Sequence, residues 1–126
     1  MPLASGLLTG RYTKDSVFGK DDHRSYNRNG EAFDKGETFS GVDYELGLQA
    51  VEDLKRLFHT ESLIPYALRW ILMHDAVSAV IPGASMCEQV LTNVKAAELT
   101  ALTPEQMEGV AAIYDKYIRE SVHCNW

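Results

Sequence analysis

Hydrophobic residues recur with helical spacing through the middle of the chain and predict two helices there. Over residues 43–59 the apolar positions share one face, and the charged positions lie mostly opposite. Residues 63–73 are apolar on nearly all sides, with Arg69 as the single charge, so we expect this second helix to be covered all round. Ser62 is predicted to cap it, and Pro65 is tolerated in its first turn. The shared apolar face of 43–59 consists of Tyr44, Leu48, Val51, Leu54, Leu57 and Phe58.

The C-terminal residues predict a further helix. Thr103 is followed by Pro104 and, three residues on, by Gln106, which combines an N-cap, a proline in the first turn and a capping box. The apolar and aromatic stripe after this start is more typical of core than of a binding face. It consists of Met107, Val110, Ala111, Tyr114, Tyr117 and Ile118.

A short apolar run, Val77–Ile81, carries β-branched residues without helical spacing and predicts a buried strand. Pro82 and Gly83 end it, because proline lacks a backbone donor and glycine frees the backbone. Ser85 then stands three residues before Glu88, and this capping box predicts a helix that starts at the next residue, Met86, and ends near Leu99.

The turn before this helix has two interpretations. A glycine beside a helix N-terminus lets a phosphate approach the unpaired N–H groups. Gln89 and Asn93, four residues apart on one face, could then hydrogen-bond a polar ring beside the phosphate. The alternative is an ordinary strand-to-helix connection in which Ser85 caps its own helix.

The opening residues predict a second, very short strand and then a glycine turn with a cation. Gly6 and Gly10 have three residues between them and Arg11-Tyr12 follows, so the turn is not a Walker A loop. A glycine-bearing turn can still hold a phosphate through Arg11 and free N–H groups. Residues 13–42 are polar, glycine-dotted and without periodicity, which is typical of a lid, a binding loop or a disordered segment.

Two strands joined by helices are parallel by default, and a two-stranded parallel sheet leaves both edges open. The pattern is therefore typical of part of a repeating strand–helix architecture from which most strands are missing. We treat the chain as a single partial domain with five segments: 1–12, 13–42, 43–75, 76–99 and 103–126.

Composition narrows the class of protein further. The 126 residues are 45% hydrophobic and 24% charged, as in a globular chain, and the net charge of -6 argues against nucleic acid or an anionic membrane as partner. The chain has no apolar run long enough to span a membrane and no secretory signal, so we expect a cytoplasmic protein. Cys87 and Cys124 lack metal-ligand spacing and are expected to be free buried thiols, with a disulfide between them as the alternative.

Four segments, in this order, carry a resemblance to a known family. They are Pro2–Tyr12, the Ala67-Leu68-Arg69-Trp70 element, Val80–Ser85 with Glu88, Gln89 and Asn93, and the C-terminal pattern that runs from Tyr114 through His123 to Trp126. The chain resembles the C-terminal part of the aldo-keto reductases over essentially all its residues. The resemblance is closest to the bacterial general-stress and inositol-operon type and to the potassium-channel beta subunits.

The resemblance implies an α/β fold, namely the C-terminal fragment of an NADP(H)-binding (β/α)8 barrel, whose active site lies at the carboxyl ends of the strands. Val77–Ile81 corresponds to the eighth strand and the start of the chain to the seventh. This chain alone would be mainly α-helical with two short strands.

The resemblance also implies cofactor contacts. Pro2, Leu3, Ala4 and Ser5 match positions that line the nicotinamide and the pyrophosphate, Arg11 matches a basic position at the pyrophosphate, and Arg24 matches a loop arginine that folds over the cofactor. Gly83, Ser85, Gln89 and Asn93 match the surroundings of the adenosine 2′-phosphate and the adenine. The phosphate interpretation of the capped turn is therefore favoured.

The chain departs from the family pattern in three respects. Thr92 stands where the family usually has a Glu that holds the adenine amine, and the candidates near the 2′-phosphate, Ser85, Met86 and Gln89, are uncharged. The family's catalytic Asp, Tyr, Lys and His lie in the N-terminal half, where Tyr donates the proton and the cofactor supplies hydride. We assign no catalytic and no metal-binding residue in this chain.

Three hypotheses follow. The first is the C-terminal cofactor-binding part of an NADP-dependent reductase, inactive alone and partnered by the missing N-terminal half of the barrel. The second is a non-enzymatic protein that forms homo-oligomers through its apolar 63–73 helix, because large exposed apolar patches drive association. The third is a cofactor-binding module without chemistry.

Overall fold

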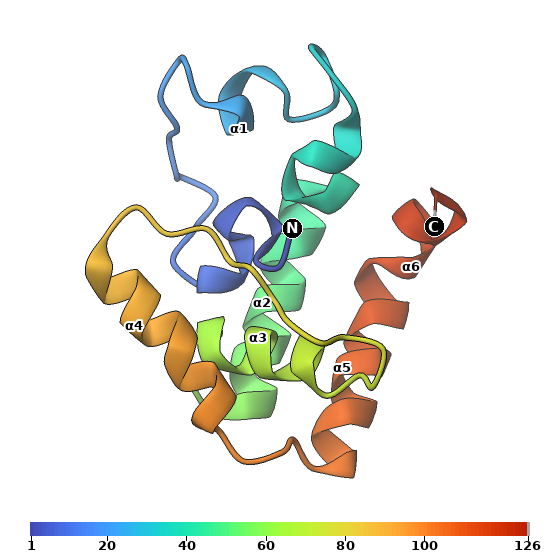
Figure 1. The fold of residues 1–126 in the computed structure, drawn as a ribbon. Helices are drawn as coiled ribbons and strands as arrows, with labels where there is room; N and C mark the ends of the chain where they lie inside the picture. Colours follow the sequence, from blue (N-terminus) through green and yellow to red (C-terminus); the bar gives the residue numbers. More distant parts are fainter. Residues whose placement is uncertain (126) are drawn as a thin grey trace.

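Helices and turns make up the regular structure that the computed structural model describes, which covers residues 1–125 (Figure 1). Trp126, the last residue of the C-terminal pattern, lies outside the described residues. The α-helices are α1 (His23–Tyr26), α2 (Tyr44–Phe58), α3 (Ile64–Leu72), α4 (Cys87–Lys95), α5 (Pro104–Tyr117) and α6 (Arg119–Val122). Short 3-10 helices are η1 (Ala4–Thr9), η2 (Lys35–Glu37), η3 (Phe39–Gly41), η4 (Ala96–Glu98) and η5 (His123–Asn125).

Both predicted strands are wrong for this chain, since no strand occurs between residues 1 and 125. The opening residues form η1 instead, and Val77–Ile81 lies in an irregular segment between α3 and α4. The side chain of Ile81 is 88% exposed rather than buried. Within the described chain, the backbone of residues 78–84 makes no hydrogen bond. A strand exists only beside a neighbour that pairs its N–H and C=O groups, and this segment has none here.

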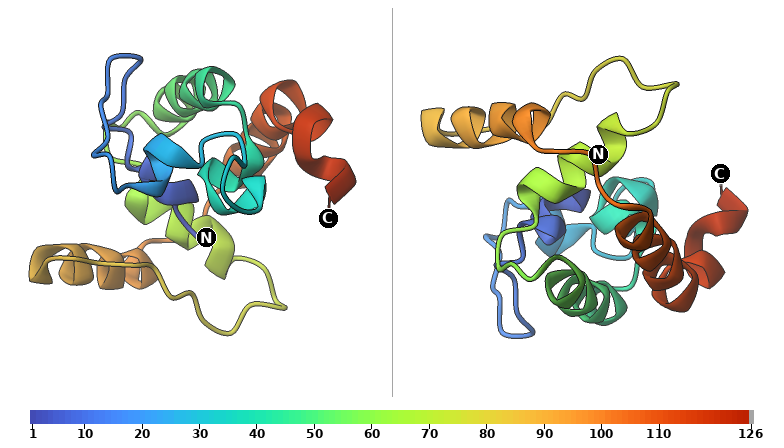
Figure 2. Two further views of the ribbon diagram at one scale, coloured as in Figure 1. Left: turned by 90° about the horizontal axis from the view of Figure 1, so that it is seen from above. Right: turned by 90° about the horizontal axis from the view of Figure 1, so that it is seen from below.

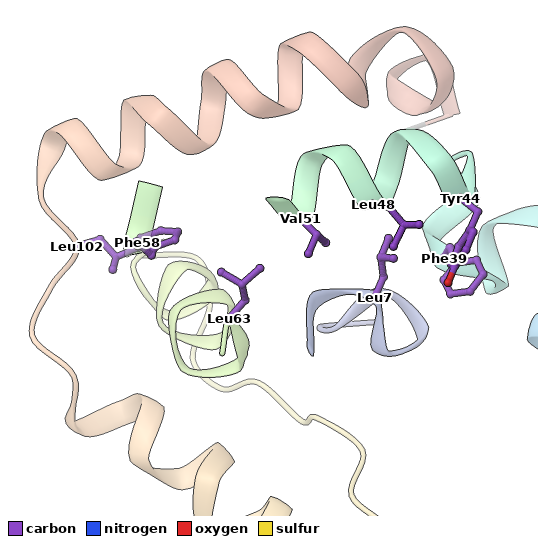
Figure 3. Close-up of a cluster of buried hydrophobic side chains, with 8 residues drawn as sticks. All are labelled: Leu7, Phe39, Tyr44, Leu48, Val51, Phe58, Leu63 and Leu102. Carbon is purple, nitrogen blue, oxygen red and sulfur yellow. The ribbon is translucent and has the colours of Figure 1, made fainter. Parts of the chain in front are cut away.

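Helix α2 is the centre of the core. Its apolar face packs on η1 and α5, while α3 lies on the far side of η1 and carries α4 on its outer surface (Figures 1 and 2). Figure 3 shows the buried cluster between these elements. Its members are Leu7, Phe39, Tyr44, Leu48, Val51, Phe58, Leu63 and Leu102.

Helices α2 and α5 both begin at a side-chain cap, of which only the cap of α5 was predicted. Asp43 Oδ1 accepts hydrogen bonds from the N–H groups of Glu45 and Leu46, both at 3.0 Å, and starts α2. Thr103 and Gln106 exchange side-chain and backbone hydrogen bonds of 3.2 and 2.9 Å at the start of α5. These bonds satisfy N–H groups that a helix leaves unpaired at its N-terminus.

Two other local predictions are wrong. Ser62 does not cap α3, because its N–H donates to the hydroxyl of Thr60 and Leu63 takes the cap position without a side-chain bond. The all-round cover expected for 63–73 is also missing from the described chain, where only Leu63 and Leu68 of this segment are buried. On α5, Met107 and Val110 pack against the core as predicted.

Cys87 and Cys124 are both exposed free thiols, so the expectation that they are buried is wrong. Cys87 lies at the start of α4, and Cys124 lies in η5 at the end of the described chain. None of the helices described between residues 1 and 125 has the length and apolar character needed to cross a membrane.

The loop 13–42 is ordered by Asn27, whose side chain is fully buried. Its Oδ1 accepts hydrogen bonds from the N–H groups of Ala32 and Phe33, both at 2.8 Å. Its Nδ2 donates to Thr38 Oγ1 at 3.3 Å and to the carbonyl oxygen of Asp34 at 3.4 Å. The side-chain amide of Asn27 thus binds backbone N–H and C=O groups that have no helix or strand partner in this loop.

We expect Asn27→Ala to lower the free energy of unfolding by about 2 kcal/mol, because a fully buried amide is removed and the N–H groups of Ala32 and Phe33 lose their acceptor. Urea unfolding followed by circular dichroism measures the change. Asn29→Ala is the matched control: it is an exposed asparagine of the same loop, and its loss is expected to cost about 0.5 kcal/mol or less. Equal effects of the two substitutions would contradict the role given to Asn27.

Candidate cofactor-binding site

The first group of predicted cofactor residues lies on the turn η1. Ala4 and Ser5 have positive φ angles of 47° and 54°, a conformation that side chains with a Cβ adopt at a cost. The carbonyl oxygen of Ser5 accepts a hydrogen bond from Arg24 Nη1 at 3.3 Å, and its hydroxyl oxygen accepts one from the N–H of Phe39 at 3.1 Å. The structure therefore brings Ser5 and Arg24 together, although 18 residues separate them in the chain.

Arg24 is held from several sides. Its Nε donates to Asp22 Oδ1 at 2.8 Å, its Nη2 donates to Asp22 Oδ2, and its Nη1 also donates to the hydroxyl of Tyr12. The guanidinium stands over the ring of Phe18, with 4.7 Å from Cζ to the ring centroid. The hydrogen bonds from Arg24 lower the pKa of Asp22 from 3.8 to about 2, and the same pairing raises the pKa of Arg24.

The remaining residues of this group differ in exposure. Pro2 and Leu3 are half-buried beside η1, whereas the side chain of Arg11 is exposed and has no ion-pair partner among residues 1–125. His23 lies within 3.4 Å of the Ser5 hydroxyl and 3.7 Å of Asp22. Of the two arginines in this group, Arg11 makes no ion pair among residues 1–125 and Arg24 is paired with Asp22.

The second group lies at the start of α4. The predicted helix is present and begins one residue later than expected, at Cys87. Its cap is made by Gln89 rather than by Ser85 and Glu88: Gln89 Oε1 accepts from the N–H groups of Ser85 at 2.7 Å and Met86 at 3.2 Å. The Gln89 carbonyl is therefore engaged with its own helix.

An apolar groove of about 340 Å³ runs between α4 and the segment before it. Asn93 is its polar lining residue, and Gly83 lies exposed beside it. The other lining residues are Leu72, Val80, Pro82, Ala84, Val90, Val94 and Ala97. An apolar slot with one amide is chemically suited to a flat ring such as adenine.

The two groups do not form one continuous site in this structure. Helix α3 contacts both η1 and α4 and lies between them (Figure 2). The N-terminal group supplies cations and the α4 group supplies an apolar groove with an amide. A dinucleotide has a charged diphosphate and a flat ring, and these two separate surfaces differ in the corresponding chemistry. No group of three or more potential metal ligands occurs among residues 1–125.

Residues 1–115 match the aldo/keto reductase family, which is a family of (β/α)8 barrels. Since the match covers most of the chain, this protein belongs to the aldo/keto reductase family. The predicted membership is confirmed, whereas the roles of the individual cofactor residues remain predictions.

Three relatives illustrate the relationship. The probable voltage-gated potassium channel subunit beta of Oryza sativa subsp. japonica is 31% identical over 121 residues, which cover 89% of this chain and 33% of the relative. The L-glyceraldehyde 3-phosphate reductase of Escherichia coli (strain K12) is 35% identical over 95 residues, or 75% of this chain and 26% of the relative. The aflatoxin B1 aldehyde reductase member 2 of Rattus norvegicus is 32% identical over 115 residues, or 85% and 31%. The chain spans about a quarter to a third of the length of these relatives.

Sequence analysis missed Asp22 and Tyr12, which hold Arg24 in place. The available signal was the Asp22-His23-Arg24 spacing, because an Asp at a helix start accepts from the N–H two residues on. Tyr12 gave no such signal, since its contact with Arg24 depends on how the loop folds back.

The Asp22–Arg24 pair predicts a pH dependence of stability. The pKa of Asp22 is lower in the folded chain than in the unfolded one, so its stabilisation is present above about pH 4 and is lost as the pH falls towards 2. We expect the difference in melting temperature between wild type and Asp22→Asn to shrink over this range. Asp21→Asn, the exposed neighbouring carboxylate, is the matched control for removing one negative charge. A wild-type advantage that persists undiminished at pH 2 would contradict the prediction.

Proposed function

We propose that this chain supplies the C-terminal, NADP(H)-binding third of an aldo-keto reductase and that it needs the remaining barrel for catalysis. The match of residues 1–115 to the family carries this proposal. Two relatives that share this segment are named as reductases, of L-glyceraldehyde 3-phosphate and of aflatoxin B1 aldehyde. A carbonyl compound is accordingly the proposed substrate class of the complete barrel.

The residues present suit the chemistry of the cofactor. Arg11 and Arg24 would pair with the diphosphate, because guanidinium groups bind phosphate oxygens at two points. Asn93 would hydrogen-bond the adenine in its groove, and Gly83 and Ser85 would lie near the 2′-phosphate. The bound cofactor supplies hydride. The proton donor and its partners belong to the absent part, so the chain alone reduces no carbonyl.

The incomplete packing of α3 supports a missing partner. The Nε atom of Arg69 is buried on α3 and has no hydrogen-bond partner among residues 1–125. The backbone of 78–84 likewise makes no hydrogen bond in the described chain. Unpaired polar groups of both kinds are what the remaining strands and helices of a barrel would satisfy.

Isothermal titration calorimetry with NADP⁺ tests the cofactor proposal. Asn93→Ala should weaken binding about tenfold, which corresponds to the loss of one hydrogen bond to the ring. Thr92→Glu, which restores the residue usual in the family, should tighten it about threefold or more through a new charge-assisted bond. Asn125→Ala, an exposed asparagine near the C-terminus, is the matched control. Absence of NADP⁺ binding to wild type and Thr92→Glu alike, with both proteins folded, would exclude the chain as a cofactor-binding unit.

Self-association is a second candidate function, favoured by the exposed apolar surface around α4. Leu91 and Val94 are 64% and 59% exposed, and Ile81 lies on the preceding segment. Exposed apolar surface favours association between copies of a chain. A homo-oligomer built on this surface would need no cofactor.

Sedimentation equilibrium on Ile81→Lys tests this second candidate. A charge in the apolar surface should weaken self-association about tenfold or more, because an unpaired ammonium resists burial. Val17→Lys is the matched control: Val17 is 93% exposed, but it lies in the loop 13–42 rather than near α4. A monomeric wild type, or equal effects of both lysines, would rule out this surface as the interface.

A further inference from the structure

The Asp22–Arg24 pair leaves the arginine no unused nitrogen. Nε and Nη2 point at the two carboxylate oxygens of Asp22, and Nη1 points at the Ser5 carbonyl and the Tyr12 hydroxyl. One face of the guanidinium is covered by the ring of Phe18. One N–H of Nη2 has no partner among residues 1–125, so a ligand that binds Arg24 at two points must replace one of these partners.

Asp22 is the partner that an anion would replace. A carboxylate and a phosphate both offer two oxygens to the same edge of a guanidinium, so they compete for one position. The side chains of Asp22 and Arg24 are 22% and 25% exposed, so the ion pair is not fully buried. Tyr12 and the Ser5 carbonyl contact the other edge and need not move.

The surroundings of the pair carry an excess of positive charge. Arg28 Nε donates to the carbonyl oxygen of Arg24 at 3.2 Å, and its guanidinium stands 5.8 Å from the centroid of the Phe18 ring that Arg24 also covers. Arg28 makes no ion pair among residues 1–125, although its charge acts on Glu31, so the Asp22–Arg24 contact is the single ion pair of these two guanidiniums. Removing the charge of Asp22 would leave Arg24 without a carboxylate partner, beside Arg28 as a second cation.

We infer that Asp22 is an internal competitor for an anion site at Arg24, and that the ligand of this site is a diphosphate group. The inference rests on the proposed function in that a dinucleotide cofactor is one source of this group, and free inorganic diphosphate is the other. Asp22 would hold Arg24 on the N-terminal turn in the free protein and release it when the diphosphate arrives. With a competing internal partner, the apparent affinity for diphosphate equals the intrinsic affinity multiplied by the fraction of molecules in which Arg24 is free.

Calorimetric titration with inorganic diphosphate and, separately, with NADP⁺ tests the inference. Asp22→Asn should tighten diphosphate binding about fivefold or more, because the arginine edge is then free in most molecules. Asp21→Asn removes the same charge from the adjacent exposed position and should change the affinity about twofold at most, since solvent and salt screen it. Adding Arg24→Gln to Asp22→Asn should remove the gain.

Asp22→Ser controls for loss of the α1 cap. A serine hydroxyl can accept the hydrogen bond that Asp22 accepts from the N–H of Arg24. An affinity for diphosphate that is unchanged or weaker in Asp22→Asn and Asp22→Ser overturns the inference, as does failure of both variants to fold or absence of binding in every variant. NADP⁺ bound equally by wild type and Asp22→Asn would sustain the proposed function and overturn the competitor role. A gain for diphosphate without any NADP⁺ binding would sustain the competitor role and defeat the proposed function.

Discussion

Leu7 lies against the backbone of α2 at Gly47, and the rest of the N-terminal site depends on this contact. A Cβ at position 47 would come within 2.6 Å of Leu7 Cδ2, so a larger residue there would push the turn η1 away from the helix. With Leu7 in place, Ser5 meets both Arg24 and the N–H of Phe39 at hydrogen-bond distance. A close helix–turn approach in the core thus sets the position of polar groups at the surface.

Local signals in the sequence predicted the local parts of the fold. Thr103 starts α5 as expected, because an N-cap is satisfied by residues two or three positions away. The Asp43 cap of α2 is equally local but was not predicted. Gln89 displaced Ser85 and Glu88 as the cap of α4, although all three lie within one turn, since several side chains there compete for the same N–H groups. Asn27 gave no periodic signal, and its role emerges only when the loop closes around it.

The strands failed as predictions because they depend on partners far away in sequence. Val77–Ile81 has the composition of a buried strand, yet within residues 1–125 nothing pairs with its backbone, and Ile81 is 88% exposed. A hydrophobic pattern indicates that a segment is buried in the complete fold. It does not show whether the other residues of this chain are sufficient to bury it. The apolar α3 segment shows the same discrepancy, with Arg69 Nε buried and unpaired on it. Both features agree with a chain that spans about a third of its relatives.

The two groups of candidate cofactor residues differ in whether their partners lie within the described chain. Ser5 and Arg24, which the family resemblance singled out, find their partners inside the chain, in Phe39, Tyr12 and Asp22, and so they are ordered without the remainder of a barrel. Asn93 and Gly83 border a groove whose other wall is the unpaired 78–84 segment, so their geometry depends on whatever that segment packs against. The N-terminal candidate residues are therefore held more firmly within the described chain than those beside α4. Hydrogen bonds within the described chain hold the N-terminal group. The segment 78–84 beside the α4 group makes none there, and a lone strand needs a sheet to pair with.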